Sequence, residues 1–259
     1  VGTSSNAFTG ALDGSGYTVN GLTINRPAES NIGLLGYSAG AVNNIGLIGG
    51  SVTGGNTVGD LAGYSSGTIS NAYATGTVNG QGFIGGLVGR NDIGGVIRVS
   101  HAAGTVVDTG TGDFDRAGGL VGLNGGTLNQ VYASGNLNGS SIIVGGLVGY
   151  NQAGGVINQA YATGDIMSSR AVDGDVGGLV GFNNGTISQG YATGAVAGTV
   201  GTAKVMAGLV ASNSGGSITA SFYDNSTTSQ TYSNGGTGLT TAQMQDPFTF
   251  INAGWDFGS

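Results

Sequence analysis

The sequence predicts an all-β fold, a right-handed parallel β-solenoid, from a recurring phrase and from the alternation of its side chains. The phrase GLVG or a close variant recurs seven times, and its leucine falls at Leu34, Leu61, Leu87, Leu120, Leu147, Leu179 and Leu209. Intervals of about 26 to 33 residues are typical of one coil in a stacked repeat protein. Within a unit, the stretch AYATGDI at 160–166 alternates with the period of two that a pleated strand requires.

Composition excludes several other classes. The 259 residues include 57 glycines but only 2 prolines and no collagen-like period. Frequent glycine would cost a helix about 1 kcal/mol per residue. With 39% hydrophobic and 7% charged residues, the chain can bury a core. It has no cysteine, which excludes disulfides and thiolate metal sites.

Each coil is expected to contain three short strands, read from GGLVG, GGVI and AYATGDI and separated by corners such as YNQA. So small a unit cannot cover its own apolar face, and neighbouring coils must stack strand on strand. About eight coils would then make a rod about 40 Å long. The motif leucines should form one internal column. A second is predicted from Ile69, Ile97, Leu128, Ile157, Ile187 and Ile218, and a third from Val78, Val106, Leu137, Ile166 and Val196.

An asparagine follows the motif in five coils, where the first coils have Ser38 and Ser65. The five are Asn91, Asn124, Asn151, Asn183 and Asn213. Stacked amides can hydrogen-bond along the axis, as in cross-β structures. We therefore predict an amide ladder with a structural role.

The two ends depart from the repeat. We expect a single structural domain with coils over 1–220, of which 1–32 form an incomplete first coil, and an irregular capping segment over 221–259. Met244, Phe248, Phe250, Ile251 and Trp255 form a dense apolar cluster there. A solenoid needs such cover over its open edge. A short helix is predicted around 241–245.

Charge and hydropathy limit the partners. The formal net charge of −7 argues against binding a nucleic acid. No apolar run approaches the roughly 18 residues that span a bilayer, so no membrane insertion is expected in this segment. The opening VGTSSNAFTG has no signal-peptide pattern, and we expect the segment to be part of something longer.

The units GLVGYNQAGGVINQAYATGDI and GLVGFNNGTISQGYATGAV resemble the GLUG repeat of large bacterial surface and secreted proteins, including filamentous-haemagglutinin-like adhesins exported by two-partner secretion. The flanking segments 8–27 and 221–257 also resemble parts of such adhesins. The resemblance implies a secreted or cell-surface β-solenoid with an adhesive or stalk role, and it implies no defined reaction.

Acidic insertions are the first candidate site. The two longest coils carry VVDTGTGDFDRAG, with Asp108, Asp113, Asp115 and Arg116, and MSSRAVDGDVG, with Arg170, Asp173 and Asp175. Both interrupt the same point of the repeat and should emerge on one side, about 10 Å apart. Paired carboxylates can act as acid and base or bind calcium. We expect soluble turns without catalysis or cofactor, and calcium binding stays an open alternative.

An aromatic column is the second candidate site. If the small residues of AYATG face inward, one ring per coil faces outward, at Tyr73, His101, Tyr132, Tyr161, Tyr191 and Phe222. Exposed aromatic stripes mark binding faces, and sugars stack on such rings. The alternative is that the rings pack under a loop or stack on one another and stiffen the rod. His101, the only histidine, is then a column member rather than a general base.

These observations predict a non-catalytic repeat domain of a bacterial adhesin. It would attach to a glycan, to a host or bacterial surface protein, or to another copy of itself. Two alternatives stay open, a polysaccharide-active enzyme that uses the aspartate loops and a purely structural spacer.

Overall fold

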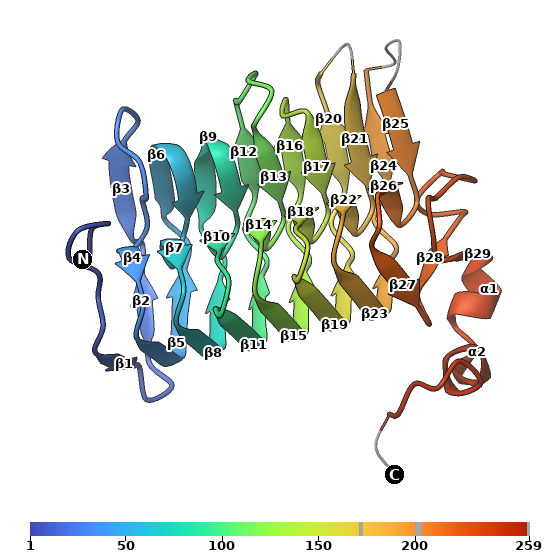
Figure 1. The fold of residues 1–259 in the computed structure, drawn as a ribbon, viewed down its shortest axis with the longest axis horizontal. Helices are drawn as coiled ribbons and strands as arrows, with labels where there is room; N and C mark the ends of the chain where they lie inside the picture. The colour runs from blue at the N-terminus through green and yellow to red at the C-terminus, as the bar shows by residue number, and fades with distance from the viewer. Residues whose placement is uncertain (171–172, 200–203, 258–259) are drawn as a thin grey trace.

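The computed structural model describes residues 1–170, 173–199 and 204–257 and shows a β-solenoid (Figure 1). Strands from successive coils stack to form three parallel β-sheets. Each turn of the chain adds one strand level to every sheet, which confirms the predicted fold class. We name the sheets by the sequence they contain: the GLVG sheet, the YATG sheet and the insertion sheet.

The GLVG sheet has seven strands, one for each complete coil. They are β4 (Leu35–Ser38), β7 (Ala62–Ser65), β10 (Val88–Asn91), β14 (Val121–Asn124), β18 (Val148–Asn151), β22 (Val180–Asn183) and β26 (Val210–Asn213). The solenoid therefore has about seven complete turns, and the predicted eighth is the partial first coil.

The YATG sheet has eleven strands. They are β1 (Ala11–Asp13), β2 (Thr18–Asn20), β5 (Ala41–Ile48), β8 (Thr68–Ala74), β11 (Val96–Ala102), β15 (Thr127–Ala133), β19 (Val156–Ala162), β23 (Thr186–Ala192), β27 (Ser217–Thr219), β28 (Phe222–Asp224) and β29 (Thr237–Leu239). β1 and β2 both pair with β5, so together they form one level of the sheet, and this level belongs to the partial first coil.

The insertion sheet also has eleven strands. They are β3 (Thr23–Arg26), β6 (Ser51–Gly59), β9 (Thr77–Gly85), β12 (Val106–Asp108), β13 (Arg116–Gly118), β16 (Leu137–Gly139), β17 (Ile143–Gly145), β20 (Ile166–Ser168), β21 (Gly174–Gly177), β24 (Val196–Gly198) and β25 (Lys204–Ala207). The long strand β9 pairs with both β12 and β13, so the first insertion splits this level of the sheet in two.

The predicted internal columns are confirmed. The six motif leucines from Leu61 to Leu209 are fully buried, and Leu34 at the open end is partly buried. Ile69, Ile97, Leu128, Ile157 and Ile187 are also fully buried and paired in register, and Ile218 near the C-terminal end is partly buried. Burying one such side chain stabilises the fold by about 1.5 to 3 kcal/mol.

Strand boundaries differ from the prediction within each coil. The segments GGVI and AYATGDI were expected as separate strands, but Val156–Ala162 is one strand, and the corner falls after it at 163–165. Gln159 in the middle of this strand has φ 52°, so the chain bends without leaving the sheet. The corner requires glycine, because a Cβ at Gly164 would overlap the carbonyl oxygen of Gly135 in the preceding coil.

The asparagine ladder is present and buried. Asn124 Nδ2 donates to Asn151 Oδ1 at 2.8 Å, and Asn151 Nδ2 donates to Asn183 Oδ1 at 2.8 Å. Asn91 and Asn213 extend it at the two ends. Each amide also donates to a backbone carbonyl of its own corner, as Asn124 does to Gly126 O at 3.1 Å. The ladder satisfies polar groups that burial would otherwise leave unpaired.

The segment after Ser221 covers the C-terminal end of the rod (Figure 1). β28 and β29 continue the YATG sheet, and the short helices α1 (Thr241–Met244) and α2 (Pro247–Ile251) follow. Helix α1 lies where a helix was predicted, and it begins with a capping box between Thr240 and Gln243. Helix α2 was not predicted from the sequence.

Candidate functional site

The aromatic column lies on the outer face of the YATG sheet, with one ring from each of five successive strands. The register pairs His101 with Tyr73 and with Tyr132, Tyr132 with Tyr161, and Tyr161 with Tyr191. All five side chains are half-buried, whereas the small or apolar residues directly before and after each of them are buried. The predicted parity of the AYATG strand is therefore correct.

The rings stack face to face along the axis. Neighbouring ring centroids are 4.4 to 5.2 Å apart, and neighbouring planes differ by 2° to 6°. Each interior ring therefore covers the faces of its neighbours, and the column presents ring edges and phenol hydroxyls to solvent. A sugar cannot stack on the face of an interior ring, so ring stacking within the column is a structural role.

Burial changes the ionisation of the column. It lowers the pKa of His101, which therefore favours the neutral imidazole that can replace a tyrosine ring. Burial also raises the pKa of Tyr191 to about 12, with a smaller contribution from Tyr161. Both shifts favour the uncharged form of the side chain.

At its C-terminal end the column meets the capping segment. Tyr191 contacts Phe250 and Trp255, with ring centroids 6.3 and 6.2 Å apart. Phe222 is in register with Tyr191 as predicted, but it is buried, because Phe250 packs edge-on against it at 5.3 Å. The capping segment thus covers the last position of the column.

Two adjoining hollows open beside this contact, and both are lined by Tyr191, Trp255 and Phe257. One, of about 400 Å³, extends along the column to Gln130, Tyr132, Gln159, Ala160, Tyr161 and Asp256. The other, of about 410 Å³, extends to Thr193, Asp224, Thr227, Thr241, Met244, Gln245 and Phe250. Sequence reasoning placed Trp255 in the cap, but did not predict that it would line a hollow beside the tyrosines.

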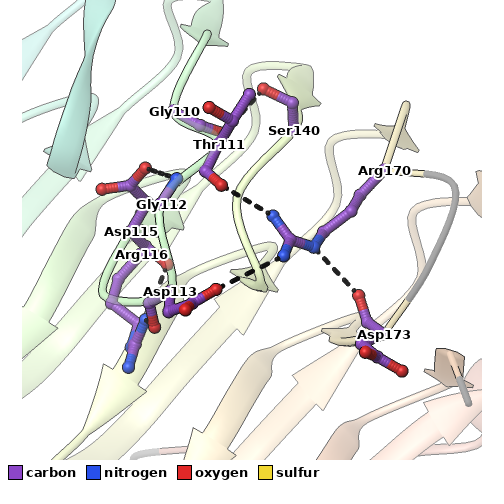
Figure 2. A network of polar contacts seen from close by, with 9 residues as sticks. All are labelled: Gly110, Thr111, Gly112, Asp113, Asp115, Arg116, Ser140, Arg170 and Asp173. Atoms are coloured by element: carbon purple, nitrogen blue, oxygen red, sulfur yellow. Dashed lines mark hydrogen bonds and ion pairs between the residues drawn. The ribbon is translucent and has the colours of Figure 1, made fainter.

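The acidic insertions emerge on one side of the rod, as predicted, and Arg170 connects them (Figure 2). Its Nη1 donates to Thr111 O at 3.3 Å, and its Nη2 lies 3.8 Å from Asp113 Oδ1. Its Nε donates to Asp173 O at 3.1 Å in its own loop. Residues 171–172 of this insertion lie outside the described residues.

The four aspartates proposed as ligands do not converge on a common point. Asp113 is 83% exposed, and Asp115 accepts from the backbone N–H of Gly112 at 2.6 Å. Asp173 is exposed, and Asp175 lies on β21, where Ser212 Oγ donates to it at 2.7 Å. Burial raises the pKa of Asp175, opposed by Ser212 and by the nearby Arg116. Within the described residues no three acidic or imidazole groups could hold a metal ion.

Asp108 and Arg116 hold the first insertion to the rod. The buried Asp108 carboxylate accepts from the backbone N–H groups of Gly110, Ser140 and Ser141 at 2.7 to 2.9 Å. Arg116 Nη1 donates to the carbonyl oxygens of Asp113 and Asp115 at 3.0 and 2.9 Å. Both side chains therefore have structural partners.

Asp60 is a buried carboxylate that sequence reasoning missed. The other complete coils have glycine at its position, directly before the motif leucine, and this departure from the repeat was the available signal. Its Oδ2 accepts from Gly76 N at 3.2 Å, and its Oδ1 is buried without a partner. Burial raises the pKa of Asp60 to about 7.

Comparison with known proteins supports the repeat assignment. Residues 140–167 match the family model described as the GLUG motif. A stretch of 44 residues, 17% of this chain, is 50% identical to a protein of Evansella cellulosilytica described as a putative Gly-rich membrane protein. The matched stretch covers 5% of that relative's length. The chain therefore carries a match to the GLUG motif within a β-solenoid.

The described part of the chain contains no helix of the length and apolarity that a membrane span requires.

Proposed function

We propose that this chain is a non-catalytic β-solenoid segment of a bacterial surface or secreted adhesin, which forms a rigid rod and attaches to a carbohydrate through the outer face of the YATG sheet. The stacked column of Tyr73, His101, Tyr132, Tyr161 and Tyr191 is the single observation that carries the proposal. It provides a strip of hydroxyl groups and ring edges with the period of the coils.

The rod itself supports a mechanical role. Three parallel sheets run through the coils in register, and the buried columns and the amide ladder follow the same axis. Each coil contacts its neighbours through the same side chains, so the stabilisation repeats along the rod. A segment of this kind can hold a binding surface at a distance from a cell.

A location at the cell surface is supported by the GLUG match and by the description of the Evansella relative as a putative Gly-rich membrane protein. Export by two-partner secretion is proposed only from the resemblance of the repeats and their flanking segments to filamentous-haemagglutinin-like adhesins.

Non-catalytic character is supported by the partners of the loop residues. A glycosidase of the usual kind needs two carboxyl groups that face one another across a sugar bond. Here Asp113 contacts Arg170, Asp115 accepts from a backbone amide, and Asp175 accepts from Ser212. These contacts give each carboxylate a role in holding the loops.

The test is a glycan array probed with the purified segment, with and without added calcium, together with a turnover assay on neutral and acidic polysaccharides. We expect saturable binding to a subset of glycans, independent of calcium, and no turnover. Release of reducing or unsaturated sugar ends would contradict the non-catalytic assignment. An array without binding would favour the spacer alternative.

A further inference from the structure

The two hollows beside Tyr191 and Trp255 differ from the rest of the aromatic column because they expose ring surface that no neighbouring coil covers. Along the column each ring lies against the next, and at the N-terminal end the ring of Tyr73 lies against Gly46. In the capping segment Trp255 is half-buried and Phe257 is 60% exposed. The exposed ring surface that adjoins the column therefore lies beside Tyr191.

We propose that these hollows form a binding subsite for a neutral carbohydrate chain, with Trp255 and Phe257 as the aromatic wall. This inference rests on the proposed function and assigns its carbohydrate contact to one place on the rod. Sites for small ligands combine aromatic walls with a few well-placed polar groups, and this combination is present here.

The aromatic wall is held in place by the solenoid. The Trp255 indole N–H donates to Ala220 O at 2.9 Å, so its hydrogen-bonding capacity is used and the ring offers an apolar surface. Gln189 Nε2 donates to Gly254 O at 2.9 Å, next to Trp255 in the chain. Phe250 packs against Trp255 with ring centroids 5.1 Å apart. A wall fixed in this way binds without the cost of ordering a loop.

Polar groups line the hollows on both sides of this wall. Gln130 and Gln159 belong to adjacent coils of the YATG sheet and have φ values of 55° and 52°. Their amides can donate to and accept from sugar hydroxyls. On the other side of Trp255 lie Thr193 and Thr227, whose hydroxyls can do the same. The subsite therefore combines apolar ring surface with hydrogen-bonding side chains, as the C–H face and the hydroxyls of a pyranose require.

Charge selects against acidic sugars. Among the described residues that line the two hollows there is no lysine or arginine, whereas Asp224 and Asp256 are present. The chain also carries a net charge of −7. An anionic sugar would meet electrostatic repulsion on approach and no cation on arrival. The occupant should be an uncharged glycan.

The experiment uses Trp255 as its own reporter, because it is the only tryptophan in the chain. Cellohexaose, mannohexaose and a hexamer of galacturonic acid are titrated into the full segment, with tryptophan emission and calorimetry recorded in parallel. We expect a saturable change in emission with a neutral hexaose, and none with the acidic one. Trp255→Ala and Phe257→Ala should each weaken binding at least ten-fold.

Two further variants serve as a second test of the hollow and as a control. Gln159→Ala removes a half-buried amide of the hollow without disturbing the wall, and it should weaken binding several-fold. Phe248→Ala removes a 65% exposed ring from the same capping segment that does not line either hollow, and it should bind like the wild type.

The outcomes separate the two proposals. Calorimetric binding of a neutral hexaose with unchanged tryptophan emission and unaffected Phe257→Ala and Gln159→Ala variants would overturn the subsite and leave the attachment function standing. Preference for the galacturonic acid hexamer would overturn the ligand class. If these hexamers and the glycan array all fail to bind, both proposals are wrong.

Discussion

Asp60 places an ionisable group inside a rod whose other complete coils have glycine at that position. Its side chain has one partner, the Gly76 N–H, and one buried oxygen without a partner. Because the carboxyl group is desolvated, its pKa in the folded protein is raised to about 7 from an ordinary value of 3.8. The folded state therefore holds this proton over a pH range in which the unfolded chain releases it.

This difference predicts a pH dependence of stability. The contribution of protonated Asp60 to the free energy of unfolding is fully present below about pH 4 and is lost as the pH rises through about 7. Each unit of pKa shift corresponds to about 1.4 kcal/mol. Asp60→Asn keeps the shape and the acceptor for Gly76, so it should be more stable than the wild type at pH 8 by several kcal/mol, and similar to it at pH 4.

Thermal unfolding followed by circular dichroism between pH 4 and pH 8 measures the effect, with the exposed Asp173→Asn as the matched control. A wild-type melting temperature that falls in parallel with that of Asp60→Asn over this range would contradict the assignment.

Val99 has a strained backbone conformation, with a φ of 50°. One residue in the long YATG strand of six coils, or between β27 and β28 in the last coil, has a positive φ of 45° to 55°, and the set is Asn44, Asn71, Val99, Gln130, Gln159, Gln189 and Ala220. For a β-branched residue this conformation is a genuine outlier, whereas asparagine adopts it several times more often. The sequence alone did not reveal this column, because its members share no side-chain type.

Val99→Asn should therefore raise the free energy of unfolding by about 1 kcal/mol, because it removes strain from an exposed site. Chemical denaturation measures the gain. Val99→Thr is the control, since it is polar but still β-branched and should show no comparable gain. Equal stabilisation by both variants would point to polarity rather than backbone conformation.

The amide ladder shows how one element stabilises many coils. Asn151 donates to Asn183 and accepts from Asn124, and all three side chains are fully buried. Removing a buried partner leaves its neighbours with the cost of desolvation and no hydrogen bond in return. The centre of the ladder should therefore be far more sensitive than its end, where Asn213 is half-buried and Asn183 is its one ladder partner.

We predict that Asn151→Ala lowers the free energy of unfolding by about 2 to 4 kcal/mol, through two lost ladder bonds and a small cavity. Asn213→Ala should cost about 1 kcal/mol. Urea denaturation of both variants checks the difference. Similar losses at the two positions would mean that the ladder does not act as a connected element.

The insertion loops have a structural role, because their polar side chains connect different coils. Asp108 accepts hydrogen bonds from the next coil, and Arg170 contacts a loop two coils away. Their charges are used in contacts between coils rather than gathered around a ligand. The sequence predicted that the loops share a side, because they interrupt the same point of the repeat. Which polar groups meet there depends on side-chain reach, which no spacing rule describes.

For the whole molecule, the capping segment determines whether the C-terminal end of the rod is closed. Phe250 is buried and packs against Phe222, Tyr191 and Trp255. Without its ring, the capping segment loses its main apolar contact with the last coils. An uncovered strand edge can pair with another chain.

Phe250→Ala should therefore cost about 3 to 5 kcal/mol of stability and promote association of the rods. Thermal unfolding and light scattering over a range of protein concentrations measure the two effects. The exposed Phe248→Ala is the control within the same helix. A destabilised variant that stays monomeric would show that the cap contributes stability without protecting the edge.

The sequence by itself determined the features that repeat. Coil length, the three apolar columns, the amide ladder and the outward position of Tyr161 follow from spacing and parity, because each coil lies on a near copy of itself and matched residues must meet. The same logic could not place the features that do not repeat. The position of Trp255 beside Tyr191 and the contact of Arg170 with Thr111 join segments with no copy in the chain. Only the tertiary structure decided these, since their partners are chosen by packing and side-chain reach rather than by register.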